Sequence, residues 1–173
     1  SQDENFKYSN GAGYQAVEMP YVGGNASMVI LLPDAGELDA FEAGLSSAKV
    51  NEIHAKLETK NVRLSMPKFV YESSFSLKEI LSEMDMVDAF EAADFSGING
   101  NKDLFISEIL HKAFVSVDEE GTEAAAATAV IISLTAMPEE AVEMTLNHPF
   151  VYMIRDNVSG TILFMGRVLN PVK

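Results

Sequence analysis

The sequence contains no cysteine among its 173 residues. Without cysteine the chain has no disulfide, no thiolate nucleophile and no cysteine-ligated metal site. A secreted protein can also fold without disulfides, so their absence leaves the redox compartment open. No apolar run reaches the length of a membrane span and no signal peptide opens the chain, so the sequence predicts no membrane partner and leaves export undecided.

Basic residues are scarce. Twelve Lys and Arg stand against twenty-six Asp and Glu, which gives a net charge of -14. Such a chain repels a phosphate backbone unless it carries a local basic patch, and no basic cluster occurs in the sequence. The composition therefore predicts no nucleic-acid partner.

Signatures of catalysis are also missing. The three histidines are isolated and lack the spacing that places two imidazoles on one helix face, and no Gly-x-Ser-x-Gly elbow or glycine-rich phosphate loop occurs. We expect His54 at the surface, His148 in a turn, and His111, which lies in an apolar strand, in the core. The sequence predicts neither an enzyme nor a bound cofactor.

Two weaker motifs carry little weight. The loop at 99–103 places Asn99, Asn101 and Asp103 at alternate positions, but it lacks the glycine and the final glutamate of a calcium loop, so no metal is predicted. Asn25 and Asn157 each begin an Asn-x-Ser pattern, which matters only in a secretory context.

What is present describes a folded α+β domain. The sequence is 47% hydrophobic and 22% charged, which is typical of a globular protein, and its length suits one domain. The patterns predict a hairpin, two short helices broken near Gly44, a strand, a further helix, a long strand and a C-terminal hairpin, with mostly antiparallel pairing. The corresponding ranges are 14–32, 38–57, 62–66, 77–81, 104–118 and 148–171.

The stretch from Asp118 to Glu140 has two interpretations. Its alanines and its acidic start favour a helix. With a period of two, one face instead carries no charge, and the stretch can enter a sheet as a strand without burying a charge. That face consists of Thr122, Ala124, Ala126, Thr128, Val130 and Ile132.

Several motifs, in one order along the whole chain, resemble the serpins, the family of serine-protease inhibitors. They are "VEMPYVGGNASMVILLPD", "MPKF", "ADFSGI", "ILHKAFVSVDEEGTEAAAATA" and "HPFVYMIRDNVSGTILFMGRVLNP". The resemblance implies a serpin-type multi-sheet α+β fold, with residues 1–173 as a single partial serpin domain and a reactive loop at about 119–146. It also implies that the chain is the C-terminal half, so that a missing N-terminal half of the same protein is a partner.

By the same resemblance, the chain is a suicide-type inhibitor of serine endopeptidases, with cysteine endopeptidases left open. A protease attacks a bait bond in the exposed loop, and the loop then inserts into the central sheet. The bait bond corresponds to Thr135–Ala136, with Leu134 as the alternative. The hinge corresponds to Glu119, Glu120, Gly121, Thr122, Glu123, Ala124, Ala125, Ala126, Ala127 and Thr128.

Further implications concern the target and the support of the loop. No Lys or Arg occurs from Thr122 to His148, which favours elastase-, subtilisin- or chymotrypsin-like proteases. The resemblance pairs Lys68 with Glu119 as a gate and places His111 beneath the central sheet as a structural residue. An extracellular location is expected, with an intracellular one open. The alternatives are a non-inhibitory carrier or chaperone and a non-functional fragment.

Overall fold

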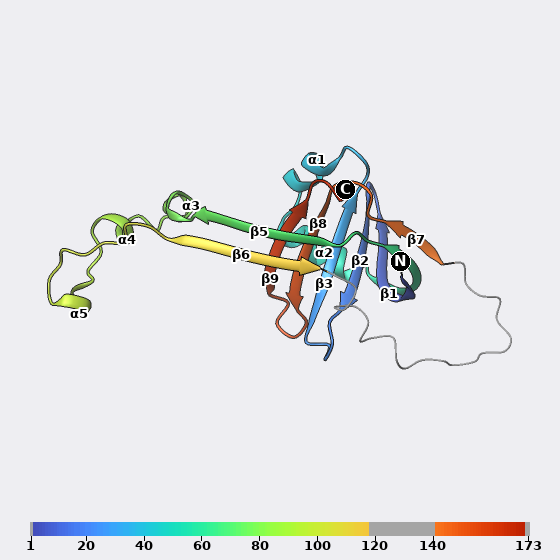
Figure 1. Cartoon of the computed structure of the whole chain (residues 1–173), viewed down its shortest axis with the longest axis horizontal. Helices are drawn as coiled ribbons and strands as arrows, with labels where there is room; N and C mark the ends of the chain where they lie inside the picture. Colours follow the sequence, from blue (N-terminus) through green and yellow to red (C-terminus); the bar gives the residue numbers. More distant parts are fainter. Residues whose placement is uncertain (1, 118–140, 172–173) are drawn as a thin grey trace. The chain divides into compact units, whose positions relative to one another are not determined.

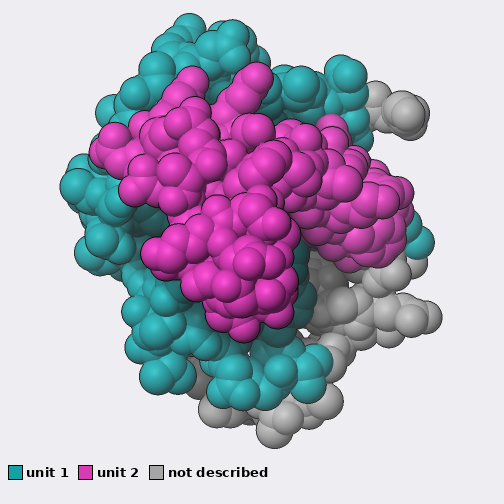
Figure 2. All heavy atoms as spheres, turned by 90° about the vertical axis from the view of Figure 1, so that its left-hand side faces the viewer, with its two compact units in different colours: residues 1–69, 118–173 teal, residues 70–117 magenta. Residues whose placement is uncertain are grey.

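The computed structural model describes residues 2–117 and 141–171 (Figure 1). The chain divides into two compact units, unit 1 from residues 1–69 and 118–173 and unit 2 from residues 70–117 (Figure 2). The described residues form an α+β structure with one seven-stranded and one two-stranded sheet, and the predicted fold class is confirmed. The single domain predicted for residues 1–173 stays a prediction.

The elements follow one another along the chain with short connections. The strands are β1 (Gln2–Gly11), β2 (Tyr14–Pro20), β3 (Ala26–Pro33), β4 (Glu58–Ser65), β5 (Phe69–Ser76), β6 (Leu110–Val117), β7 (Val142–Thr145), β8 (Phe150–Asp156) and β9 (Ile162–Val168). The helices are α1 (Leu38–Ala43), α2 (Ser47–Ala55), α3 (Lys78–Glu83), α4 (Asp88–Glu91) and α5 (Ser96–Asn99).

Unit 1 is built on the sheet β7-β4-β1-β2-β3-β8-β9. Its neighbours pair antiparallel except β4 and β7, which are parallel. The long strand β1 holds the sheet together, because its first part pairs with β4 and its last part with β2. The mostly antiparallel pairing agrees with the prediction.

Both predicted hairpins are confirmed. β2 and β3 are joined through Gly23 and Gly24, whose φ angles of 87° and 70° suit glycine. β8 and β9 are joined by a turn in which Oδ1 of Asp156 accepts hydrogen bonds from the backbone N–H groups of Val158 and Ser159. Side-chain acceptance of this kind fixes a turn locally, so the turn residues alone indicated it.

Helices α1 and α2 pack on the sheet through a shared apolar core. Ser46 caps α2 by accepting a hydrogen bond from the Lys49 backbone N–H at 3.2 Å, and Ile53 is the buried anchor of this helix at 1% exposure. The core also contains Tyr14, Ala16, Val29, Leu31, Leu38, Val151 and Met153. The predicted break near Gly44 lies between the two helices, as expected.

Unit 2 contains the two-stranded sheet of β5 and β6, and the short helices α3, α4 and α5 lie between these two strands along the chain. β5 and β6 run in opposite directions (Figure 1), and the Leu77 N–H donates to the Ile109 carbonyl at 2.9 Å where they meet α3. Ser76 Oγ accepts from the Lys78 N–H at the start of α3. β6 begins at Leu110, so the strand expected from Leu104 is six residues too long at its start.

Candidate functional site

The predicted reactive loop, at about 119–146, begins after β6 and includes β7. β6 ends at Val117 and β7 begins at Val142. The predicted bait residues Thr135, Ala136 and Leu134 lie outside the described residues. The same holds for the predicted hinge, namely Glu119, Glu120, Gly121, Thr122, Glu123, Ala124, Ala125, Ala126, Ala127 and Thr128.

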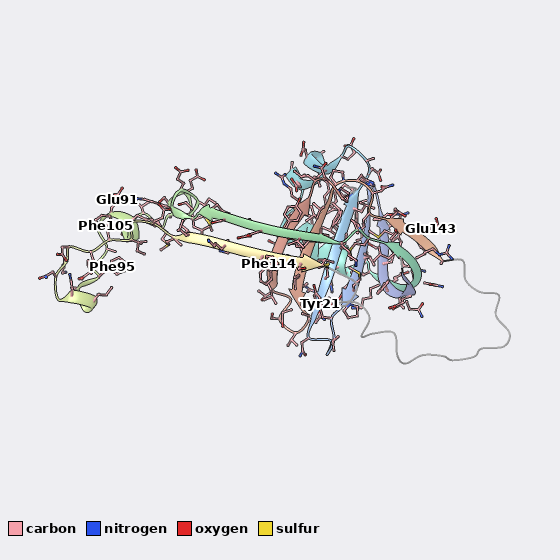
Figure 3. All side chains as sticks on the ribbon, viewed as in Figure 1. Tyr21, Glu91, Phe95, Phe105, Phe114 and Glu143 are labelled. Atoms are coloured by element: carbon pink, nitrogen blue, oxygen red, sulfur yellow. The ribbon has the colours of Figure 1, made fainter. Side chains whose placement is uncertain are left out.

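The C-terminal end of the predicted loop is a strand. β7 pairs in parallel with β4, Met144 is fully buried, and the Leu146 N–H donates to the Ser65 carbonyl at 2.8 Å. Glu143 on β7 (Figure 3) accepts from Arg63 Nη1 at 3.0 Å in an exposed pair, which contributes little stability. The backbone is thus paired from Val142 onward, within the predicted loop range of about 119–146, and the loop boundaries stay a prediction.

Lys68 lies in the connection between β4 and β5, directly after Pro67, and its side chain is exposed. Its predicted partner Glu119 lies outside the described residues. The gating ion pair therefore stays a prediction.

His111 lies on β6 and is exposed in this chain, and its predicted structural place beneath the central sheet stays a prediction. Its ring packs against that of Phe75 on β5, with 5.3 Å between centroids and 54° between planes. The physical reason is that β6 pairs with β5 in a sheet of two strands, which covers neither face within unit 2. Phe114, labelled on the same strand in Figure 3, is 62% exposed for the same reason.

The residues at the end of β6 alternate between two faces. Ala113, Val115 and Val117 are half-buried, and their neighbours Phe114 and Ser116 are exposed. The strand that leads into the predicted loop thus has two distinct faces, as the period of two of a β-strand requires.

A charged cluster in unit 1 was not predicted. Glu18 on β2 is 4% exposed, and its Oε2 lies 3.3 Å from His54 Nε2 and 3.6 Å from Lys7 Nζ. Arg155 Nη1 on β8 lies 2.5 Å from the same His54 nitrogen. Burial, and then the charge of Arg155, lower the pKa of His54 against the opposing effect of Glu18.

A sequence signal for this cluster existed. Glu18 interrupts an apolar strand and Arg155 directly follows an apolar run, and a charge at such a place is expected to have a partner. His54 was expected at the surface, yet its side chain is 29% exposed and packs into the cluster. His148 lies in the predicted turn, where its Nε2 is 2.8 Å from the Pro33 carbonyl oxygen.

A groove of about 650 Å³ lies between the helices α1 and α2 and the hairpin β8–β9. Polar groups from Glu42, Asn51 and Arg155 share its wall with apolar Leu45, Val50 and Met165. This mixture of apolar wall and few polar groups is typical of small-molecule sites.

The described residues contain no group of three or more His, Asp or Glu side chains placed to hold a metal ion. In the loop at 99–103, Asn99 Nδ2 donates to Asp103 Oδ1 at 2.9 Å, so these two side chains bond each other. No helix in the described ranges is long and apolar enough to cross a membrane.

Fold and sequence together define the class. The structure is a mostly antiparallel α+β fold in which a long connection joins the two-stranded sheet to the seven-stranded one. A family model described as "Serpin (serine protease inhibitor)" matches residues 1–171. The chain belongs to the serpin family, and the predicted resemblance is confirmed.

Individual relatives agree with this assignment. A serpin-like protein from Thermococcus kodakarensis is 41% identical over 98% of this chain and 40% of its own length. The leukocyte elastase inhibitor of Xenopus tropicalis is 44% identical over 96% of this chain and 45% of its own. The chain therefore spans less than half the length of these two curated relatives.

Solved structures show the same fold over a similar share. A thyroxine-binding globulin in complex with thyroxine matches 99% of this chain and 46% of its own, with a TM-score of 0.82 and 28% identity. The thermophilic serpin tengpin in its native state covers 98% of this chain and 45% of its own, with a TM-score of 0.76 and 32% identity.

The comparisons lend no support to the expected extracellular location. A relative whose name states a compartment, "Intracellular coagulation inhibitor 2" of Tachypleus tridentatus, is 38% identical over 94% of this chain. The compartment stays a prediction, with the intracellular alternative open.

Proposed function

We propose that this chain supplies the reactive loop of a serpin that inhibits serine endopeptidases, with cysteine endopeptidases as a possible second class. The observation that carries the proposal is the stretch from Thr122 to Ile132, one face of which has only small or apolar uncharged side chains. Such a face enters a sheet without overpacking it or burying a charge. Relatives named leukocyte elastase inhibitor support the same activity.

The proposed mechanism uses the loop as bait. A protease attacks the bond Thr135–Ala136, or the bond after Leu134, and forms an acyl-enzyme. Cleavage frees the hinge, and the loop inserts as a strand and carries the protease with it before the acyl-enzyme is hydrolysed. The native state is held kinetically, and the strain released on insertion drives the change.

Two ends of the loop matter for this mechanism. The strand β6 leads into it, and at its far end Met144 of β7 and Leu146, directly after β7, are both buried. We propose that this far end stays anchored, while the hinge end, which begins at Glu119, contains Gly121, whose missing Cβ permits a change of backbone conformation. Lys68 and Glu119 are proposed to gate that end.

The test is incubation of the intact gene product with an elastase-, a subtilisin- and a chymotrypsin-type protease. We expect a complex that survives SDS and a released peptide that begins near Ala136, read by mass spectrometry. A peptide that begins elsewhere moves the bait bond, and cleavage with neither a complex nor a rise in thermal stability contradicts inhibition.

A matched pair of hinge variants tests the insertion step. Ala126→Glu places a charge on the uncharged face, so the loop should be cut without trapping the protease. Ala125→Glu places the same charge on the opposite face, which already carries Glu123, and should keep the complex. Equal behaviour of the two variants would contradict insertion as a two-faced strand.

A carrier function is a second candidate, favoured by the groove of about 650 Å³ beside α2 and by the likeness to a thyroxine-binding globulin. Calorimetric titration with thyroxine tests it. Binding that is lost in Leu45→Trp, which fills the groove, supports the carrier; absence of heat in the parent chain argues against it.

A further inference from the structure

One nitrogen of His54 faces two groups that it cannot satisfy together. Arg155 Nη1 lies at 2.5 Å and Glu18 Oε2 at 3.3 Å from His54 Nε2. A guanidinium only donates hydrogen bonds, so Nε2 has to accept from Arg155 and must carry no proton. A carboxylate only accepts, so a bond to Glu18 requires a proton on the same nitrogen.

The observed arrangement favours Arg155 and leaves the carboxylate incomplete. Glu18 Oε2 is buried and has no hydrogen-bond partner within the described ranges. Lys7 Nζ, at 3.6 Å, is beyond hydrogen-bond distance, and its side chain is 54% exposed. A buried carboxylate oxygen without a hydrogen-bond donor lowers the stability of the folded state. A donor that reached Oε2 would therefore stabilise this site.

His54 and Arg155 border a small cavity that is otherwise lined by apolar side chains. Both line a cavity of about 10 Å³ whose other walls are Val29, Leu31, Val50, Ile53 and Met153. This volume is at the lower limit for a single water molecule. At most a single water molecule therefore fits in this cavity beside the two side chains.

Arg155 also links His54 to the neighbouring hairpin β8–β9. It follows an irregularity in the pairing of β8 with β9, and its Nε donates to the Gly160 carbonyl at 3.2 Å in the β8–β9 turn. One guanidinium thus joins helix α2, through His54, to the turn. Loss of the His54 contact frees one of its two described anchors.

We propose that His54, Glu18 and Arg155 form a proton-driven latch between helix α2 and the β8–β9 hairpin. With a neutral ring, Nε2 accepts from Arg155 and the latch is closed. When solvent supplies a proton to Nε2, the ring donates to Glu18, the like charge of Arg155 is repelled, and the guanidinium leaves α2.

The charged groups facing the ring come from three strands: Lys7 from β1, Glu18 from β2 and Arg155 from β8. Burial first, then Arg155, lower the pKa of His54 below its ordinary value of 6.5; Glu18 opposes them and Lys7 adds a smaller lowering. The unfolded chain consequently takes up this proton at higher pH than the folded chain. The stability given by the closed latch is complete above about pH 6.5 and is lost as the pH falls toward the folded-state pKa.

Nitrogen-15 NMR of the histidine side chains in the 173-residue chain, from about pH 8 to about pH 5, tests the latch directly. At the upper pH we expect His54 Nε2 without a proton and slowly exchanging Arg155 guanidinium protons. Protonation of the ring should accelerate that exchange along the same titration curve. The proposal is overturned if Nε2 already carries a proton at the upper pH. It is also overturned if the exchange rate of the Arg155 guanidinium protons does not change as His54 titrates.

Variants provide an independent reading. In Arg155→Met the His54 titration midpoint should move to higher pH, because a cause of the lowered pKa is removed.

In His54→Gln the side-chain carbonyl oxygen can accept a hydrogen bond from Arg155, but the side chain does not titrate. The urea midpoint of this variant should therefore change less between about pH 7.5 and about pH 5.5 than the urea midpoint of the parent chain does. The control His111→Gln, on exposed β6, should keep the parent's pH dependence. A parental pH dependence in His54→Gln, or an unmoved midpoint in Arg155→Met, contradicts the latch.

Discussion

Gly166 on β9 has no space for a side chain. It stands opposite Tyr152 in the β8–β9 pairing, and a Cβ at this position would lie 2.6 Å from the Tyr152 hydroxyl oxygen and 2.7 Å from its ring carbon Cζ. Tyr152 is 5% exposed and its ring packs on Phe69 with 5.5 Å between centroids, so it cannot easily move aside. At this residue glycine is required by close packing and not by backbone conformation.

We therefore expect Gly166→Ala to lower the free energy of unfolding by about 1–3 kcal/mol, the usual cost of overpacking. Urea denaturation measures it. The matched control is Gly97→Ala in α5, where nothing lies within 4 Å of the added Cβ, so little loss is expected. A similar loss in both variants would contradict the steric explanation.

At the scale of elements, Asn157 ties two hairpins together. Its Nδ2 donates to the Gly24 carbonyl at 2.9 Å and to Ser27 Oγ at 2.8 Å, and its backbone N–H donates to the Asn25 carbonyl at 2.8 Å. The β8–β9 turn is thus bonded to the β2–β3 turn. The glycan-acceptor pattern at Asn157 has its amide nitrogen already engaged in this clamp.

Asn157→Ala should cost about 1–3 kcal/mol of unfolding free energy, because it removes both side-chain bonds and leaves the 1%-exposed Ser27 without this donor. Thermal or urea unfolding measures the loss. Asn51→Ala, at an exposed position of α2, is the control and should change stability little. If the two variants unfold alike, the clamp contributes nothing measurable.

At the scale of the whole molecule, the two units differ in how far their strands are buried. β3 and most of β8 are buried along their length, whereas β5 beyond Phe69 and alternate residues of β6 are exposed. A two-stranded hairpin alone is only marginally stable in water. Unit 2 is therefore expected to open locally without unfolding unit 1.

Hydrogen exchange followed by mass spectrometry tests this difference. Amides of β5 and β6 should exchange at least about tenfold faster than those of β3 and β8, which corresponds to about 1.4 kcal/mol less local stability. Equal protection in the two sheets would show that the exposed strands of unit 2 are held as firmly as the core of unit 1.

The sequence by itself determined the local elements. Turn chemistry at Gly23, Gly24 and Asp156 and the break near Gly44 depend on residues close together in the chain, so the two hairpins and the two helices were predicted correctly. The family motifs added the fold class. The predicted hinge and bait lie outside the described residues and stay predictions.

Only the tertiary structure decided which distant side chains meet. It paired β7 with β4 from Val142 onward, left His111 exposed on a sheet of two strands, and brought Glu18, His54 and Arg155 together across three elements. Local propensity carries no information on these contacts, because strand order and burial depend on long-range packing. The latch exists because the fold places one donor and one acceptor against a single ring nitrogen.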